Sequence, residues 1–123
     1  MLRALVVICL LLAGCVGDGG LERDRKILVL VDRVVSATGS VAEKATRTLV
    51  EVGRPSIALL ETGLYEAEPI ARQRIVRAFA AIATRHGLTA EVAPILQHLA
   101  VSDPDPEVRR LAAAELESLA AGD

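Results

Sequence analysis

Glycine and proline divide this sequence into apolar segments of helical length. Beyond residue 20 no glycine interrupts such a segment, and each one closes a segment: Gly39, Gly53, Gly63, Gly87 and Gly122. Glycine suits the position just past a helix C-terminus because it tolerates the left-handed conformation found there. Proline suits the first helical turn, where its missing N–H would be unpaired anyway, and three prolines fit that place: Pro55, Pro69 and Pro106. This pattern predicts helices over residues 22–37, 40–52, 55–62, 69–85, 90–101 and 106–121.

The spacing of apolar residues favours helices over strands. In the last segment the apolar positions follow i, i+3, i+4, i+8 and i+11, at Val108, Leu111, Ala112, Leu116 and Leu119. Aromatic residues make up 2% of the chain, whereas 52% of it is hydrophobic, so the core must consist of Leu, Val, Ile and Ala. Packed helices have this composition more often than sandwiches or barrels. We therefore expect one all-α domain.

Two segments leave alternatives open. Residues 27–31, ILVLV, are apolar on all sides and would suit a strand by themselves, but the charged flanks and the length of the segment favour a buried helix. Pro94 either lies at the start of a helix that begins near Ala93, or kinks a helix that begins earlier.

Capping residues mark two of the predicted helix starts. Ser40 and Glu43 have the spacing of a capping box, in which the two side chains satisfy backbone amides at the start of a helix. Asp105 directly precedes Pro106, and the residue before a proline avoids the helical region. We therefore predict Asp105 as the N-cap of the last helix.

The N-terminus has the properties of an export signal. Arg3 is followed by an apolar run of about ten residues, whereas a helix that spans a bilayer needs about 20. The run ends in Leu12-Ala13-Gly14-Cys15, which resembles the lipobox of bacterial lipoproteins. The resemblance implies a signal peptide over 1–14, acylation of Cys15, a flexible spacer over 15–21 and a folded domain over 22–123. The alternative is an ordinary secretory signal in which Cys15 has no role.

Lipidation implies a location in the bacterial cell envelope. Each buried methylene of an acyl chain contributes about 0.8 kcal/mol, so two or three chains would hold the exported protein on a membrane without crossing it. Where the host has two membranes, Val16 after the cysteine resembles the residues that favour sorting to the outer membrane, facing the periplasm.

A coarse internal repeat accompanies the predicted helices. Val41-Ala45-Leu49-Val52, Ala71-Ile75-Phe79-Ile82 and Val108-Ala112-Leu116-Leu119 align at spacings of 30 and 37 residues. Such a period is typical of solenoids built from stacked helix pairs. Residues 103–119, DPDPEVRRLAAAELESL, resemble the first helix of a HEAT repeat of the short, phycobilisome-lyase-like class. The resemblance implies pairs over 40–62 and 69–101, a final half repeat, and the first helix as an N-terminal partner.

In HEAT families an aspartate before the helix and an arginine near its start form a polar ladder between adjacent repeats. The resemblance assigns these roles to Asp103 or Asp105 and to Arg109, with Arg72 as the matching arginine of the preceding repeat. Position 42 is alanine where a third arginine would stand. Arg110 is expected to face solvent; a clamp of two arginines on phosphate or carboxylate is the alternative reading of this pair.

The sequence contains no set of residues with the spacing of a catalytic or metal site. Both cysteines lie within residues 1–15, and His86 and His98 have neither a metal-ligand spacing nor a carboxylate three or four residues away. The net charge is -2, with neither a basic stripe nor stacking aromatics, which argues against nucleic-acid binding. We expect a protein that is not an enzyme, with no catalytic residues, metal or cofactor.

These observations favour an interaction module. We expect the helices over 55–62 and 90–101 to line one face for a protein partner, with Glu61, Glu91, Gln97 and His98 as candidate contacts. Tyr65 either packs at the junction between repeats or contacts that partner. The apolar edge of an unpaired last helix would be covered by the partner or a second copy. A lyase-like role, by analogy with the repeat class, and a purely structural lipoprotein are the alternatives.

Lipidation of Cys15 can be tested directly. In cells fed labelled palmitate, the label is expected to accompany the protein and to disappear in Cys15→Ser, because the thiol is the group that accepts the lipid. Label that persists in Cys15→Ser would favour the ordinary secretory signal.

Overall fold

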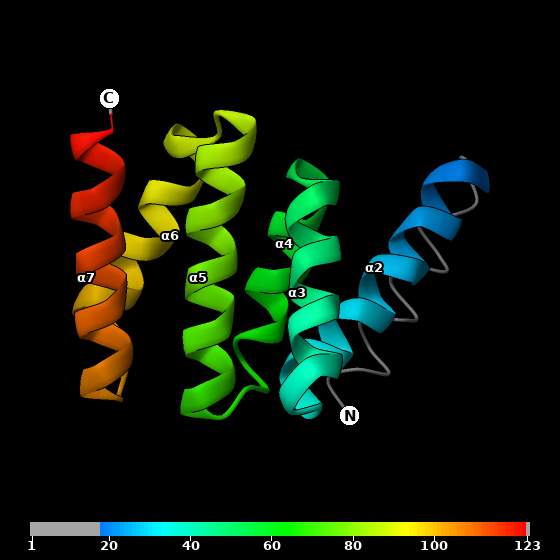
Figure 1. Ribbon diagram of the computed structural model, residues 1–123, viewed down its shortest axis with the longest axis horizontal. Coiled ribbons are helices and arrows are strands. Elements are labelled where there is room, and N and C mark those ends of the chain that lie inside the picture. Colours follow the sequence, from blue (N-terminus) through cyan, green and yellow to red (C-terminus); the bar gives the residue numbers. More distant parts are fainter. Residues whose placement is uncertain (1–17, 123) are drawn as a thin grey trace.

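The computed structural model describes residues 18–122 and is all-helical over that range. The helices are α2 (Asp18–Ser36), α3 (Gly39–Val52), α4 (Arg54–Gly63), α5 (Pro69–His86), α6 (Thr89–Ser102) and α7 (Pro106–Ala121) (Figure 1). All six predicted helices are present. None of the helices in the described range is both long enough and apolar enough to cross a lipid bilayer.

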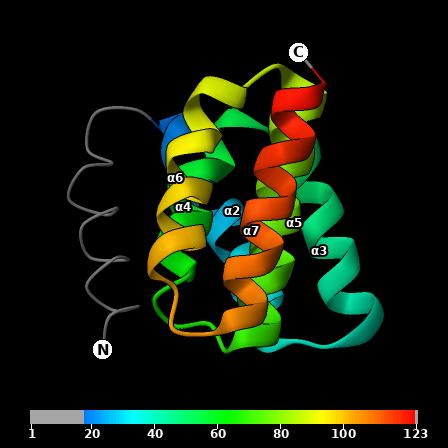
Figure 2. The same cartoon turned by 90° about the vertical axis from the view of Figure 1, so that its left-hand side faces the viewer.

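The helices form two layers that pack on α5. Helices α3, α5 and α7 lie side by side (Figure 1), and α4 and α6 lie on one side of this row (Figure 2). Helix α2 packs chiefly on α3 and also reaches α4 and α5. Helices α4 and α6 both contact α5, and a salt bridge between Arg54 and Glu91 joins α4 to α6 near their first turns, while a groove lies between them further along the two helices.

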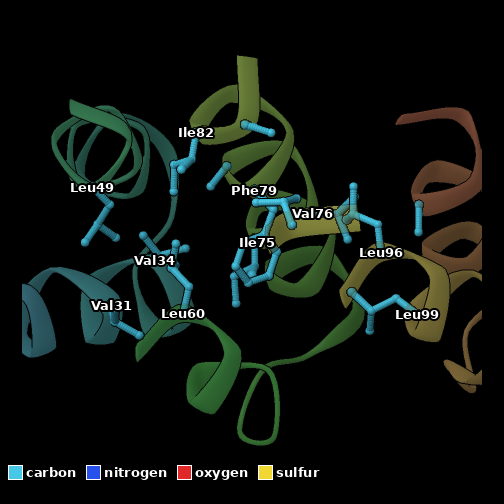
Figure 3. Close-up of a cluster of buried hydrophobic side chains, with 14 of the residues drawn as sticks. Val31, Val34, Leu49, Leu60, Ile75, Val76, Phe79, Ile82, Leu96 and Leu99 are labelled. Atoms are coloured by element: carbon cyan, nitrogen blue, oxygen red, sulfur yellow. The ribbon is translucent and has the colours of Figure 1, made fainter. Parts of the chain in front are cut away.

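Helix α5 is central because it buries apolar side chains on several sides. Ile75, Val76, Phe79 and Ile82 are each fully buried. Figure 3 shows Ile75 and Phe79 between the two halves of the core, with Val76 directed toward Leu96. A helix with apolar residues around most of its circumference is stable only when neighbours cover it.

Residues 27–31 are helical, so the strand alternative is wrong for this segment. Ile27, Val31 and Val34 are buried at a spacing of three to four residues, while Val29 is 52% exposed. This is the periodicity of a helix with one covered face.

The start of α2 differs from the predicted spacer. The helix begins at Asp18, so residues 18–21 are helical, while residues 16 and 17 lie outside the described residues. Glycine costs about 1 kcal/mol relative to alanine in a helix, and the helical run that follows Gly20 outweighs this cost.

One predicted cap is present and the other is absent. The Asp105 carboxylate accepts a hydrogen bond from the backbone N–H of Val108 at 3.0 Å and caps α7. The capping box at Ser40 is wrong, because α3 begins one residue earlier, at Gly39 with φ 61, after Thr38 as N-cap. Ser40 therefore lies inside the first turn, and no side chain caps this helix.

Pro94 lies inside α6, which begins at Thr89, so the helix starts before the proline. A proline at this depth removes one backbone hydrogen bond of the helix. The alternative in which the helix starts near Ala93 is wrong.

The buried face of α3 is shifted by one residue from the predicted apolar stripe. Val41 and Val52 are 51% and 36% exposed, whereas Ala42, Ala45 and Leu49 are almost fully buried. Small alanines on this face allow α2 and α5 to approach α3 closely, and valines would not fit as well.

The last helix, α7, lies at one end of the row of helices (Figure 1), and its outer side is the edge that was expected to be apolar. Helix α7 packs extensively on both α6 and α5. Positions 37 residues apart show the difference between its outer side and that of α5: buried Val76 and Ala80 of α5 correspond to exposed Ala113 and Glu117 of α7. No large hydrophobic side chain of α7 is exposed within the described residues. This outer side therefore carries alanine and polar residues where large apolar side chains were expected.

The close approach of α4 to α2 depends on Gly63. A Cβ at this position would lie 2.8 Å from Val31 Cγ1, while a Cβ at Gly20 would meet nothing within 4 Å. Gly63→Ala is expected to lower the free energy of unfolding by about 1–3 kcal/mol through overpacking. Gly20→Ala is the control and should leave it unchanged or raise it by up to about 1 kcal/mol. Denaturant unfolding followed by circular dichroism measures both; equal effects would contradict this packing.

Candidate binding groove

A groove of about 460 Å³ lies between α4 and α6. Its lining comes from the end of α4, from one side of α6, and from the base formed by α5 and the turn before α7: Glu61, Leu64, Tyr65, Arg72, Pro94, Ile95, His98, Leu99, Ser102, Asp103 and Pro104. The groove brings together three of the predicted partner-binding residues, Glu61, Tyr65 and His98, and two of the predicted ladder residues.

Helical periodicity places these side chains on the groove. On α6, Pro94, His98 and Ser102 are four residues apart and share one side of the helix, beside Ile95 and Leu99. On the opposite wall the chain winds down after Gly63 through a run of backbone hydrogen bonds between residues 60 and 67. Tyr65 lies in this turn, four residues after Glu61.

The base of the groove is a buried ion pair. Arg72 Nε donates to Asp103 Oδ2 at 2.9 Å, and Arg72 Nη2 donates to Asp103 Oδ1 at 3.0 Å. The two side chains are 15% and 3% exposed. This bidentate geometry is the strongest form of an arginine–carboxylate pair. It fixes α5 to the turn between α6 and α7.

Both members of the pair make further hydrogen bonds. Arg72 Nη1 donates to the carbonyl oxygen of Ala67 at 2.8 Å, which holds the loop between α4 and α5. Asp103 Oδ1 also accepts from the backbone N–H of Asp105 at 2.9 Å. A buried charge is tolerated when such bonds replace its lost hydration. The base of the groove is therefore rigid and electrically neutral.

Arg109 repeats part of the Arg72 arrangement in the next helix of the row. Arg109 Nη1 donates to the carbonyl oxygens of Asp103 at 2.7 Å and Pro104 at 3.2 Å. Arg72 and Arg109 thus each reach a carbonyl five residues earlier in the chain. Of the ladder residues, Asp103 joins the two helices, while Asp105 caps α7.

Arg110 faces solvent, as expected, and pairs with Glu107 within its own helix. The hydrogen bond to Glu107 and the charge of that carboxylate raise the pKa of Arg110 above its usual value. Because Arg109 is committed to backbone carbonyls and Arg110 to Glu107, the two arginines do not form a shared clamp.

Tyr65 lies on the rim of the groove and is 82% exposed, so it does not pack into a junction between helices. Its ring is available for contact. Two other predicted contacts lie elsewhere: Gln97 is exposed on α6 outside the groove lining, and Glu91 forms a salt bridge with Arg54.

The apolar wall of the groove was not predicted from the sequence. Pro94, Ile95 and Leu99 form this wall on α6, opposite Leu64, and each lies beside residues that point into the core. Their spacing on α6 gave a signal, since they fall on the side of the helix next to buried Leu96.

The two histidines have separate surroundings. His86 Nε2 lies 2.7 Å from the carbonyl oxygen of Val50 and its ring covers Gly53, whereas His98 is exposed on the groove. Within residues 18–122 no three His, Cys, Asp or Glu side chains come close enough together to hold a metal ion. The arrangement is suited to contact with a segment that carries both apolar and polar groups.

Comparisons of the sequence with protein-family models and curated proteins, and of the structure with solved structures, give no match. The resemblances to lipoproteins and HEAT repeats therefore remain proposals.

The ion pair at the base makes a stability prediction. Asp103→Asn leaves Arg72 buried beside a neutral amide and is expected to lower the free energy of unfolding by about 2–4 kcal/mol. Glu107→Gln, which removes the exposed partner of Arg110, should leave the denaturation midpoint unchanged because solvent screens that pair. Urea unfolding of the two variants beside the parent checks this; a loss of similar size in both would show that burial of the pair is unimportant.

Proposed function

We propose that this chain is a lipid-tethered helical repeat module of the bacterial envelope that binds a protein partner in the groove between α4 and α6. The observation that carries the proposal is the groove itself, in which an apolar wall and exposed polar groups stand over a neutral, rigid base. Residues held by buried hydrogen bonds are already in their binding geometry, which reduces the entropy lost on association.

The repeated use of the same contacts supports the repeat architecture. Helices α5 and α7 are neighbours in the row, and each begins with a proline and carries an arginine that reaches back five residues. Asp103 before α7 receives the arginine of α5. These are the relations expected of stacked units in which each buries its apolar face on the next.

A protein segment fits the groove better than a compact small molecule. Small-molecule sites enclose most of the ligand surface, whereas this groove is open and Tyr65 on its rim is 82% exposed. Tyrosine is enriched in protein interfaces because it adds apolar area and a hydroxyl with few rotatable bonds.

Lipidation of Cys15 would hold the module close to the membrane. Cys15 lies outside the described residues, and α2 begins three residues after it. Three residues extend over at most about 10 Å, so the folded part would lie at the lipid surface. The partner would then be another envelope protein that approaches the same surface.

Site-specific photocrosslinking in cells tests the groove. A photoreactive phenylalanine derivative at Tyr65 is expected to give one discrete crosslinked protein, because this position projects from the rim of the groove. The same derivative at Arg110, exposed on α7 away from the groove, is the matched control and should give none.

Comparing crosslinks from Tyr65 and Arg110 also shows which face of the protein contacts the partner. A crosslink from Arg110 with none from Tyr65 would move the interaction to another face. Absence of any product from Tyr65, Glu61 and His98 alike, all of which line the groove, would contradict a partner at this groove.

A further inference from the structure

We infer that the groove selects a partner segment that carries a lysine or arginine next to an apolar residue. This inference rests on the proposed function and names the chemistry of the partner. It follows from the charge at the groove, from the exposed tyrosine and from the distribution of arginines over the rest of the molecule.

Glu61 supplies an available negative charge at the groove. Its side chain is exposed and takes part in none of the salt bridges formed within residues 18–122. The other charges in the lining cancel, because Arg72 and Asp103 pair with each other. Glu61 is therefore the carboxylate of the groove lining that no arginine or lysine of the described residues neutralises.

Tyr65 and Glu61 can act on the same cation. They are four residues apart at the end of α4 and line the same groove. An ammonium or guanidinium group is attracted by the face of an aromatic ring as well as by a carboxylate. A basic side chain that lies across the end of α4 can therefore contact both groups.

The apolar wall defines the neighbouring residue of the partner. Ile95 on α6 and Leu64 on the opposite wall are partly exposed to the groove, and buried Leu99 lies behind them in its lining. An apolar side chain inserted between them would lose water contact while the adjacent basic residue reaches the rim. This combination excludes a purely polar segment, which would leave the wall uncovered.

Arginines that lack a partner lie on a different face. Hollows of about 510 Å³ and 480 Å³ involve α3 and α5, and they are lined in part by Arg47, Arg77 and Arg85. None of these three belongs to a salt bridge within the described part of the chain. Together with Arg74, these arginines outnumber the two carboxylates in the same hollows, Glu43 and Glu115, so that face would attract a basic segment less than the groove does.

A spectroscopic titration tests the inference, because Tyr65 is the only tyrosine and the chain has no tryptophan. Emission of the full chain in nonionic detergent therefore reports the surroundings of Tyr65 alone. Three probe peptides without aromatic residues are titrated: acetyl-Leu-Arg-Leu-Arg-Leu-amide and its counterparts with glutamine or glutamate in place of arginine.

The basic peptide is expected to change the Tyr65 emission with an affinity about three- to ten-fold higher than the glutamine peptide, and the glutamate peptide should bind most weakly. Glu61→Gln should remove most of this preference. Glu117→Gln on the outer side of α7 makes the same change in net charge and is the control; it should preserve the preference.

The other possible results of the titration each contradict one part of the inference. Equal affinities for the three peptides, unaffected by Glu61→Gln, would overturn the basic partner while leaving a binding groove. Equal loss in Glu61→Gln and Glu117→Gln would show that net charge alone attracts the peptide. No change of Tyr65 emission with any peptide would overturn the inference, and the crosslinking experiment would then decide separately whether the groove binds a partner at all.

Discussion

The buried pair of Arg72 and Asp103 is the interaction on which the groove depends. It connects the start of α5 to the turn between α6 and α7, and the same guanidinium holds the loop that follows α4. The turn before α7 is thereby fixed to the start of α5 and to the loop that precedes it, 31 residues earlier in the chain. The pair is bidentate and almost completely buried. Two hydrogen bonds therefore hold both side chains in one geometry. Tyr65 and Glu61 lie on the wall that this contact positions.

Packing around α5 provides the second constraint. Phe79 supplies the largest buried side chain, while the close approach of neighbouring helices relies on small residues such as Ala45 and Gly63. This alternation of large and small side chains fills the interior without aromatic residues elsewhere in the core. It also explains why α4 and α6 remain apart. Both rest on α5, whose width separates them, and the space between them is left to solvent.

Much of the fold could be predicted because its signals are local. Helix ends follow from proline and glycine, and the cap at Asp105 follows from its place before a proline. The face of α3 could not be predicted in this way, since hydrophobicity selects Val41 whereas the tight contact with α2 selects Ala42. The groove is likewise a tertiary property. The sequence indicated Glu61 and His98 as free of the core, but the wall between them depends on how far apart α4 and α6 lie, which is set by the packing of both helices on the rest of the molecule.

The comparison of α5 with α7 shows how one pattern can serve two environments. Arg72 and Arg109 make the same contact to a carbonyl five residues earlier, yet the helix surfaces beside them differ. Where α5 carries Val76 for its neighbour, α7 carries exposed Ala113. An outer surface of alanine and polar residues on the helix at the edge of a stack offers no large apolar side chain on which a further helix could pack. We therefore propose that association takes place through the groove and not through α7, because the groove combines an apolar wall with the carboxylate of Glu61, whereas no large hydrophobic side chain of α7 is exposed within the described residues.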